Sequence, residues 1–211
     1  MLRGCSLAVM VGILSLCLVP GANAAIIFSD NFETETYGTN TLLDNWAISD
    51  GTIDVVGTGF FSGLCNPASG SSPSPAHCVD MDGSSGNAGT ITSNLSFNFV
   101  PGSYTLSFWA AGNQRGTPSD SMAVSIGSLF SSTLSLNPTD PWTHFIGLFT
   151  VLAPETAPIV FNHAGGDNVG ILLDDVVLSS DVQAVPEPMS LTLLGTGLAA
   201  LGYKRRRTGK A

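Results

Sequence analysis

The residues best suited to chemistry are two adjacent aspartates, Asp174 and Asp175, which interrupt an apolar run. This run spans residues 171–178, and its sequence ILLDDVVL predicts a β-strand buried on both faces. Strict alternation puts Asp174 on the face of Val176 and Asp175 on the face of Val177, so a carboxylate lies on an apolar face either way. A buried carboxylate is costly unless it meets a cation, backbone donors or a proton. Because Ca²⁺ prefers oxygen ligands, it is the partner that the sequence favours.

The charge of the chain limits how such acids are neutralised. The 211 residues include 7 Lys and Arg against 16 Asp and Glu, which gives a net charge of −9. Residues 25–184 hold 15 of the acids and one basic residue, Arg115, so this stretch carries −14. Contact with a phosphate backbone depends on Lys and Arg, so nucleic-acid binding is excluded. Charged residues make up only 11% of the chain, which indicates an extracellular β protein.

Arg115 has two possible roles as the single cation of this stretch. It can form a structural ion pair with Asp80, Asp82 or Asp120, and many acids compete for it. It can instead lie at a ligand site and donate two hydrogen bonds to a sugar diol or a uronate. The sequence leaves both roles open.

The three tryptophans, Trp46, Trp109 and Trp142, are candidate platforms for sugar rings. Aromatic faces stack on the C–H faces of pyranose rings. Trp109 is the best candidate, because alternation places it on one strand face with Ser and Thr side chains. The alternative for each tryptophan is burial in the core of the domain.

Catalytic motifs find little support in the sequence. The three histidines, His77, His144 and His163, lack metal-ligand spacing, and the chain has neither a Gly-x-Ser-x-Gly elbow nor a phosphate-binding glycine loop. The separation of a glycosidase carboxylate pair is a three-dimensional fact that sequence does not show. We therefore predict a protein that is not an enzyme, with an extracellular polysaccharide hydrolase as an alternative.

A body of about 160 residues, which suits one domain, must position these side chains. Helical periodicity is missing, and short β-rich runs separated by Gly, Pro, Asn and Ser recur instead. This pattern predicts an all-β fold, a jelly-roll β-sandwich. We expect strands at residues 25–28, 46–48, 52–56, 78–81, 89–93, 96–100, 104–110, 122–126, 133–136, 143–151, 158–161 and 171–179.

Cys65 and Cys78 are the cysteines of this body, and an oxidising compartment favours a disulfide between them. The residues between them are rich in Pro, Ser and Gly, so the bond would close a loop that cannot pack by itself. Metal binding by this pair is a poor alternative, since the spacing is long and only His77 is adjacent.

The N-terminus has the three parts of a secretory signal peptide: Arg3, an apolar stretch at residues 7–19, and a small-x-small site that ends at Ala24. We expect export by the Sec machinery and cleavage after Ala24. The C-terminus also has three parts, of which the middle one is a short apolar helix at residues 189–203. A short membrane anchor would explain this helix and the basic residues after it, which the positive-inside rule keeps inside. The proline-rich part before it is Val185, Pro186, Glu187 and Pro188, and the basic stop after it is Lys204, Arg205, Arg206 and Arg207.

Pro-Glu-Pro, a short apolar helix and an Arg-rich end, in that order, resemble the PEP-CTERM protein-sorting signal of Gram-negative bacteria that make exopolysaccharide. The resemblance implies recognition by an exosortase, a membrane cysteine transpeptidase, and removal of the tail at or near Pro-Glu-Pro.

A second resemblance rests on Asp30-Asn31-Phe32-Glu33 near the start of the body and Asp-Asp-Val near its end. Together they look like the galactose-binding-like jelly roll of many carbohydrate-binding modules. This resemblance implies a structural Ca²⁺ held by Glu33 and Asp174, away from the ligand face. The alternative is that Glu33 is a solvated surface residue and the aspartates cap a strand end. The strings at residues 79–83, 111–116 and 165–170 are similar to a bacterial subgroup of these domains.

These observations predict a signal peptide at residues 1–24, a β-sandwich domain at 25–184 and a sorting signal at 185–211. We expect a precursor anchored in the inner membrane, which then reaches the cell surface or extracellular matrix. Its predicted role is to bind glycan or build exopolysaccharide matrix, with Trp109 and Arg115 as ligand contacts. A purely structural or adhesive matrix protein without a sugar site is the alternative.

Overall fold

A computed structural model describes residues 24–65, 76–116 and 118–181. These residues form an all-β domain in which no helix occurs, and the predicted signal and membrane helices lie outside them. The strands are β1 (Ala25–Asp30), β2 (Trp46–Ser49), β3 (Asp54–Gly57), β4 (His77–Asp80), β5 (Thr90–Ser93), β6 (Phe97–Phe99), β7 (Gly102–Ala111), β8 (Asp120–Ile126), β9 (Phe130–Leu136), β10 (Thr143–Val151), β11 (Glu155–Ala157), β12 (Ile159–Ala164) and β13 (Leu172–Ser180).

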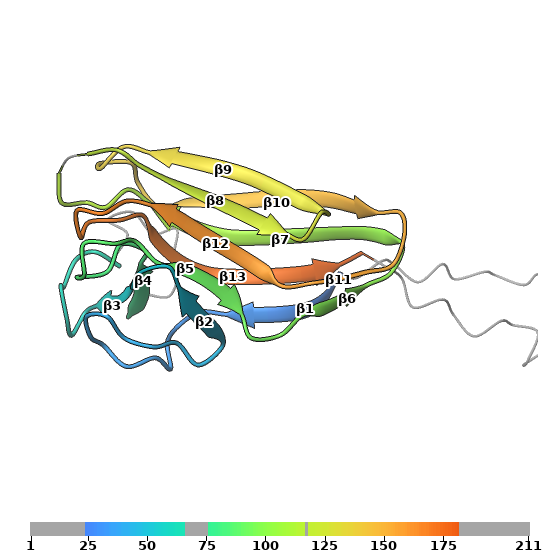
Figure 1. Ribbon diagram of the computed structural model, residues 1–211, viewed down its shortest axis with the longest axis horizontal. Coiled ribbons are helices and arrows are strands. Elements are labelled where there is room, and N and C mark those ends of the chain that lie inside the picture. The colour runs from blue at the N-terminus through green and yellow to red at the C-terminus, as the bar shows by residue number, and fades with distance from the viewer. Residues whose placement is uncertain (1–23, 66–75, 117, 182–211) are drawn as a thin grey trace, which may run out of the picture.

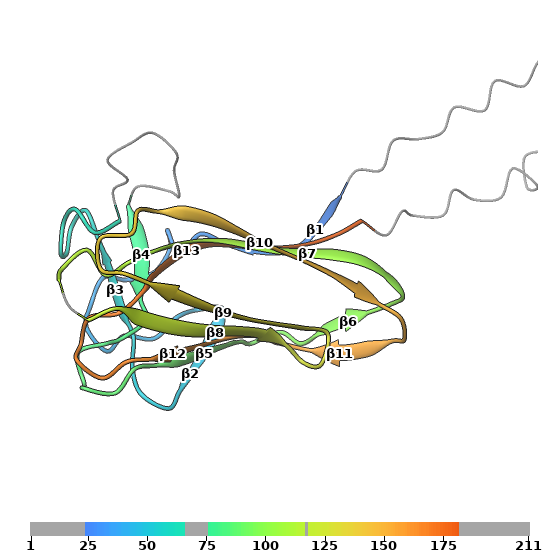
Figure 2. The ribbon, with the colours of Figure 1, turned by 90° about the horizontal axis from the view of Figure 1, so that it is seen from above.

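Two antiparallel sheets face each other across the core, as Figure 2 shows from above. The first sheet has the order β10-β7-β13-β4-β3, and β1 also pairs with β13. The second sheet has the order β2-β5-β12-β8-β9, and the short β6-β11 pair lies at one end of the molecule (Figure 1). Within the first sheet β4-β13-β7-β10 are neighbours, and in the second β5-β12-β8-β9 are neighbours. Apart from the β8-β9 hairpin, successive strands of these eight alternate between sheets, which is a jelly roll and confirms the predicted fold class.

The central strand β7 shows why this sequence forms a sandwich. Tyr104, Leu106, Phe108 and Ala110 are buried, while the residues between them are partly exposed. This period of two lets one face of the strand join the core and leaves the other at the surface. Phe108 meets Phe161 of the opposite sheet edge to face, with ring centroids 5.1 Å apart. Burial of one such side chain stabilises the fold by about 1.5–3 kcal/mol.

All twelve predicted runs overlap strands of the structure. The missing prediction is β11, whose three residues pair with β6. Its residues Glu155, Thr156 and Ala157 are too few to show alternation, so the sequence holds no signal for this strand.

Strict alternation along the last strand was wrong, because β13 contains a β-bulge. Asp174 pairs with Trp109 and Val177 pairs with Ser107, so one extra residue is inserted into β13 between these pairs. Asp174 and Val177 therefore both follow their partners to the outer face of the sheet. Val176 turns inward and joins the core, away from the face of Asp174.

Candidate functional site

A gap in the first sheet lies beside the bulge of β13. The register of β1 with β13 runs from Ser180 back to Val176, whereas β4 pairs only with Leu172 and Leu173. Neither β1 nor β4 therefore pairs with Asp174 or Asp175. The bulge residue Asp175 has a φ of 47°, a left-handed conformation that Asp and Asn tolerate better than most residues.

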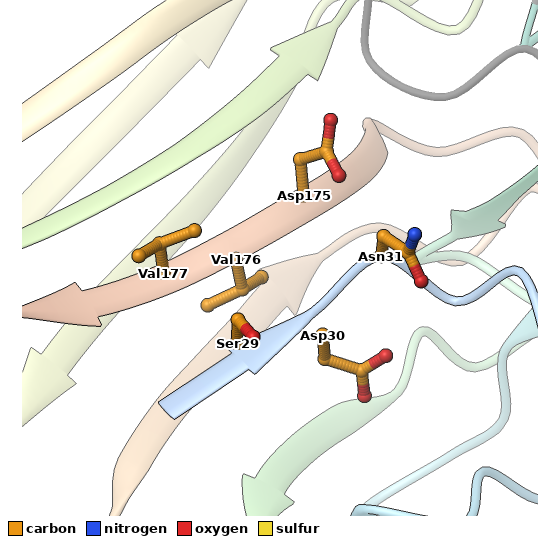
Figure 3. Close-up of a pocket in the computed structure, with 6 residues that line it drawn as sticks. All are labelled: Ser29, Asp30, Asn31, Asp175, Val176 and Val177. Atoms are coloured by element: carbon orange, nitrogen blue, oxygen red, sulfur yellow. The ribbon is translucent and has the colours of Figure 1, made fainter. Parts of the chain in front are cut away.

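A pocket of about 280 Å³ lies along the paired segments of β1 and β13 at this gap. In Figure 3 the Asp175 carboxylate and the Asp30 carboxylate point in opposite directions. Asp30 is bound within the fold, since its Oδ2 accepts hydrogen bonds from Asn45 Nδ2 at 3.1 Å and from Trp46 Nε1 at 2.8 Å. Asp175 therefore supplies the acid on the outer side of the pocket. The lining residues are Ser29, Asp30, Asn31, Asp175, Val176 and Val177.

Glu33 connects the chain after β1 to the start of β4. Its Oε1 accepts hydrogen bonds from the backbone N–H groups of His77 at 3.1 Å and Ala76 at 3.3 Å, and its Oε2 lies 3.3 Å from His77 Nδ1. The His77 ring also stacks on Tyr37, with centroids 4.0 Å apart. The Glu33 side chain is 24% exposed and bound at both oxygens, so Glu33 is not a solvated surface residue.

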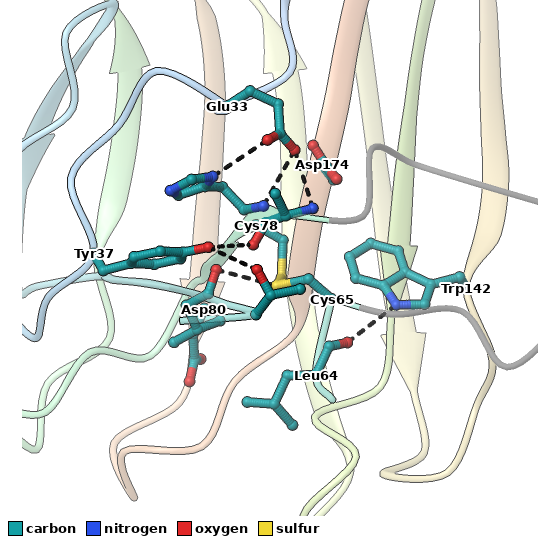
Figure 4. The surroundings of a disulfide bond; sticks show 12 residues. Glu33, Tyr37, Leu64, Cys65, Cys78, Asp80, Trp142 and Asp174 are labelled. Atoms are coloured by element: carbon teal, nitrogen blue, oxygen red, sulfur yellow. Dashed lines mark hydrogen bonds and ion pairs between the residues drawn. A yellow bond between two sulfur atoms is a disulfide. The ribbon is translucent and has the colours of Figure 1, made fainter. Parts of the chain in front are cut away.

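Asp174 is fully buried next to Glu33 (Figure 4). Its Oδ1 accepts the N–H of Asp175 at 2.7 Å, and within the described residues its Oδ2 has no hydrogen-bond partner. Burial, together with the charges of Asp175, Glu33 and Asp30, raises the pKa of Asp174 to about 9, although the backbone hydrogen bond acts to lower it. The structure thus brings together the two residues predicted as metal ligands.

These two residues fit a hard cation such as Ca²⁺. The orphaned Oδ2 of Asp174 is a buried acceptor, and the neighbouring acids already favour a positive charge at this point. Among residues 24–65, 76–116 and 118–181, no group of three or more His, Cys, Asp or Glu side chains could hold a metal ion. A Ca²⁺ ion here would therefore need further oxygen ligands beyond Glu33 and Asp174.

The predicted disulfide joins Cys65 and Cys78, whose Cα atoms are 5.7 Å apart. Both residues are buried in a second apolar cluster, on which Leu172 of β13 also packs. Cys78 follows His77 in β4, so the bond anchors the strand that supplies the N–H donors to Glu33 (Figure 4).

Arg115 forms the structural ion pair that the sequence left open. Its Nη2 donates to Oδ2 of Asp80, which is fully buried, while the Arg115 side chain is 25% exposed. Burial raises the pKa of Asp80 to about 7, although the charge of Arg115 acts to lower it. Arg115 lies in the β7–β8 loop and contacts Asp80 of β4, whereas Trp109 stacks on His144 at the outer face of the first sheet. No described contact joins these two predicted ligand residues. Contact of Arg115 with a ligand stays a prediction.

Trp109 lies on the outer face of the first sheet and belongs to neither core cluster. It pairs with Asp174 on one side and with His144 on the other, and its half-buried ring stacks on His144 with centroids 5.0 Å apart. Trp46 is buried, and Trp142 is partly buried. Trp46 is only 2% exposed, and Trp142 packs on the second cluster and donates its Nε1–H to the Leu64 carbonyl.

The sequence missed four neighbours of this face, Ser29, Asn31, Asp175 and His144, as possible ligand contacts. The first three line the pocket through the register of β1 and the bulge in β13, neither of which a pattern of residue types reveals. His144 could have been found as the partner of Trp109 only if the β7–β10 pairing were known.

In comparisons with known proteins, the sequence matches one family model, that of a short sorting motif, and the structure is similar to several solved structures. Residues 184–207 match the PEP-CTERM protein-sorting motif, which lies outside the described residues. A comparison with curated proteins found no match. The fold is similar to the K1 cleaved adhesin domain of Lys-gingipain from Porphyromonas gingivalis W83, with 18% identity over 72% of this chain and 97% of that chain and a TM-score of 0.48.

Two carbohydrate-binding modules are also among the similar structures. The CBM61 module solved with β-1,4-galactotriose has 15% identity over 70% of this chain and 92% of its own, with a TM-score of 0.46. The CBM22-1 xylan-binding domain of Paenibacillus barcinonensis Xyn10C has 14% identity over 78% and 99%, with a TM-score of 0.44.

The chain is thus an exported protein in which a jelly-roll domain precedes a C-terminal sorting signal. In the part of the chain that the structure describes, no helix is long and apolar enough to cross a membrane. The predicted membrane helix at residues 189–203 and the basic stop at 204–207 lie outside that part.

Proposed function

We propose that this chain is a non-enzymatic protein of the cell surface or extracellular matrix that an exosortase processes and that binds glycan through its jelly-roll domain. The sorting motif at residues 184–207 supports the processing, with Pro186, Glu187 and Pro188 as its cleavage region. It follows that the Sec machinery exports the precursor and that the inner membrane holds it until the tail is removed.

Trp109 is the observation that carries the glycan proposal. A large aromatic ring outside both core clusters, on a sheet face that also carries Ser107 and Thr105, offers an apolar surface beside hydroxyl groups. Sugar rings need this combination, because their C–H faces stack and their hydroxyls form hydrogen bonds. The pocket beside Asp175 adds a concave, polar surface one strand away.

A non-enzymatic role is supported by the structural contacts of two buried acids, Asp80 and Asp82. Oδ2 of Asp82 accepts hydrogen bonds from the N–H groups of Gly166 and Asp167, and Oδ1 of Asp80 accepts from Gly170. These acids bind the loop between β12 and β13, and Asp80 also forms the ion pair with Arg115.

We also propose a structural Ca²⁺ with Glu33 and Asp174 among its ligands. When bound, the ion supplies positive charge between the two carboxylates. Glu33 would then link the chain after β1, the start of β4 and the bulge of β13 at one point. This role is structural, and the sugar contacts are left to Trp109 and the pocket.

The export part is tested by the intact mass and location of the native protein in cells with and without the exosortase. We expect a surface or secreted form whose C-terminus lies near residues 186–188, and a longer, membrane-held form when the exosortase is absent. A surface form that keeps its full C-terminus would contradict processing.

The glycan part is tested by affinity electrophoresis of the exported protein through gels that contain neutral, cationic or anionic polysaccharides. Retardation by at least one polysaccharide, without release of reducing ends, is the expected result. A protein that none retards is a purely structural matrix component, and one that releases reducing ends is a hydrolase.

A further inference from the structure

The pocket and Trp109 lie on neighbouring rows of the ladder on the outer face of the first sheet, and together they are called the strip below. Neighbouring strands place Ser29 of β1 opposite Val177 of β13, which lies opposite Ser107 of β7. One row along, Trp109 lies opposite Asp174, next to the pocket residue Asp175. Strands are spaced by about 4.8 Å, so ring and pocket are within reach of adjacent units of one glycan chain.

This strip is strongly one-sided in charge. Its pocket is lined by two acids and by no base, and the outward-facing acid is Asp175. Glu33 and Asp174 lie nearby, and a Ca²⁺ ion between them would offset their charge. The one basic residue of residues 25–184, Arg115, is already bound to Asp80. Anionic sugars such as uronates would therefore meet repulsion here, and a cation would be attracted.

We propose that the strip takes a glycan that carries protonated amino groups, that is, hexosamine units without their N-acetyl groups. This inference rests on the proposed glycan binding and names the chemical class of the ligand. One sugar ring stacks on Trp109, where its positive charge also interacts with the aromatic face, and the ammonium group of a neighbouring unit contacts the Asp175 carboxylate. Asn31 and Ser29 offer hydrogen-bonding groups to the hydroxyls of the same unit.

The test is calorimetric titration of the exported protein with three oligosaccharides of equal length at low ionic strength. These are a glucosamine oligomer, its fully N-acetylated counterpart and a uronate oligomer. The variant is Asp175→Asn, because Asn keeps the size of the side chain and tolerates its left-handed backbone. Asp50→Asn is the matched control. Asp50 is an exposed aspartate outside the pocket and has a similar backbone conformation, with a φ of 49°, and its substitution removes the same charge from the protein.

We expect the glucosamine oligomer to bind more tightly than the other two, and its affinity to fall as salt is added. Asp175→Asn should weaken this binding about 5- to 10-fold, and Asp50→Asn by less than about 2-fold. Equal binding of the N-acetylated oligomer with no effect of Asp175→Asn, or preference for the uronate oligomer, would overturn the inference and leave glycan binding in place. Failure to bind any glycan in the titration or in the gels would overturn both proposals.

Discussion

Trp109 on β7 lies directly opposite Asp174 on β13, in the last pair before the bulge. The half-buried ring and the buried carboxylate thus belong to the same short stretch of ladder, on the same face of the sheet. Because the bulge positions Asp175 as well, the candidate cation site and the candidate sugar site share one structural support. A change at Asp174 is expected to reach Trp109 through the backbone of this ladder.

The first prediction concerns Ca²⁺ and thermal stability. Binding at a hundredfold excess over the dissociation constant stabilises the folded state by about 2.7 kcal/mol. For a domain of this size that corresponds to a rise in melting temperature of about 5–10 °C, measured by calorimetry with Ca²⁺ and then with excess chelator.

Asp174→Asn is the control for this effect, because the amide keeps the volume of the side chain and loses its charge. We expect the variant to fold and to show no shift with Ca²⁺. Equal melting temperatures of the unaltered protein with Ca²⁺ and with chelator would refute the cation site.

The second prediction is the pH dependence of the protein without Ca²⁺. Burial raises the pKa of Asp174 to about 9, above its ordinary value of 3.8, so the folded state holds this proton more tightly than the unfolded chain does. The contribution to stability is complete below about pH 4 and is lost as the pH rises towards about 9. Urea unfolding of the unaltered protein and of Asp174→Asn across this range isolates the effect, since the other titrating groups are common to both.

We expect the stability of the unaltered protein to fall relative to that of Asp174→Asn as the pH rises. Addition of Ca²⁺ should remove much of this fall, because the ion replaces the proton. A stability difference that stays constant from acid to alkaline pH would show that Asp174 does not titrate in this range.

The third prediction concerns the pair of Arg115 and Asp80. Arg115→Met leaves the fully buried Asp80 without its cation, so the pKa of Asp80 should rise above about 7. At about pH 8 we expect a loss of about 3 kcal/mol in the free energy of unfolding, with a smaller loss at about pH 5, where the carboxyl takes up a proton. Chemical denaturation at both pH values measures this.

Arg115→Lys retains the charge and should recover part of the stability at the higher pH. If Arg115→Met unfolds at the same denaturant concentration as the unaltered protein at both pH values, the pair does not stabilise the fold. If stability is unchanged but glycan affinity falls, Arg115 is a ligand contact, the second role that the sequence allowed.

The sequence was sufficient for the layers of the fold and insufficient for the details of the site. Alternation in β7 predicted both its buried face and the outward position of Trp109, because a regular strand has a fixed period. The bulge in β13 depends on how this strand pairs with β7 and β1, which alternation along one strand cannot show. Alternation alone therefore put Asp174 on the face of Val176 and Asp175 on that of Val177. The contact of Glu33 with the start of β4 joins residues 44 positions apart, and no pattern in the sequence predicted it, since the family resemblance paired Glu33 with Asp174 alone.

The central claim is that the outer face of the first sheet binds glycan through Trp109. Its most direct test is calorimetric titration of the polysaccharide that retards the exported protein, applied to Trp109→Ala and to the control Phe61→Ala, which removes another exposed aromatic ring. Loss of one stacking platform is expected to weaken binding by about 10-fold or more, whereas Phe61→Ala should bind as the unaltered protein does. Unchanged affinity in a folded Trp109→Ala variant would contradict the account.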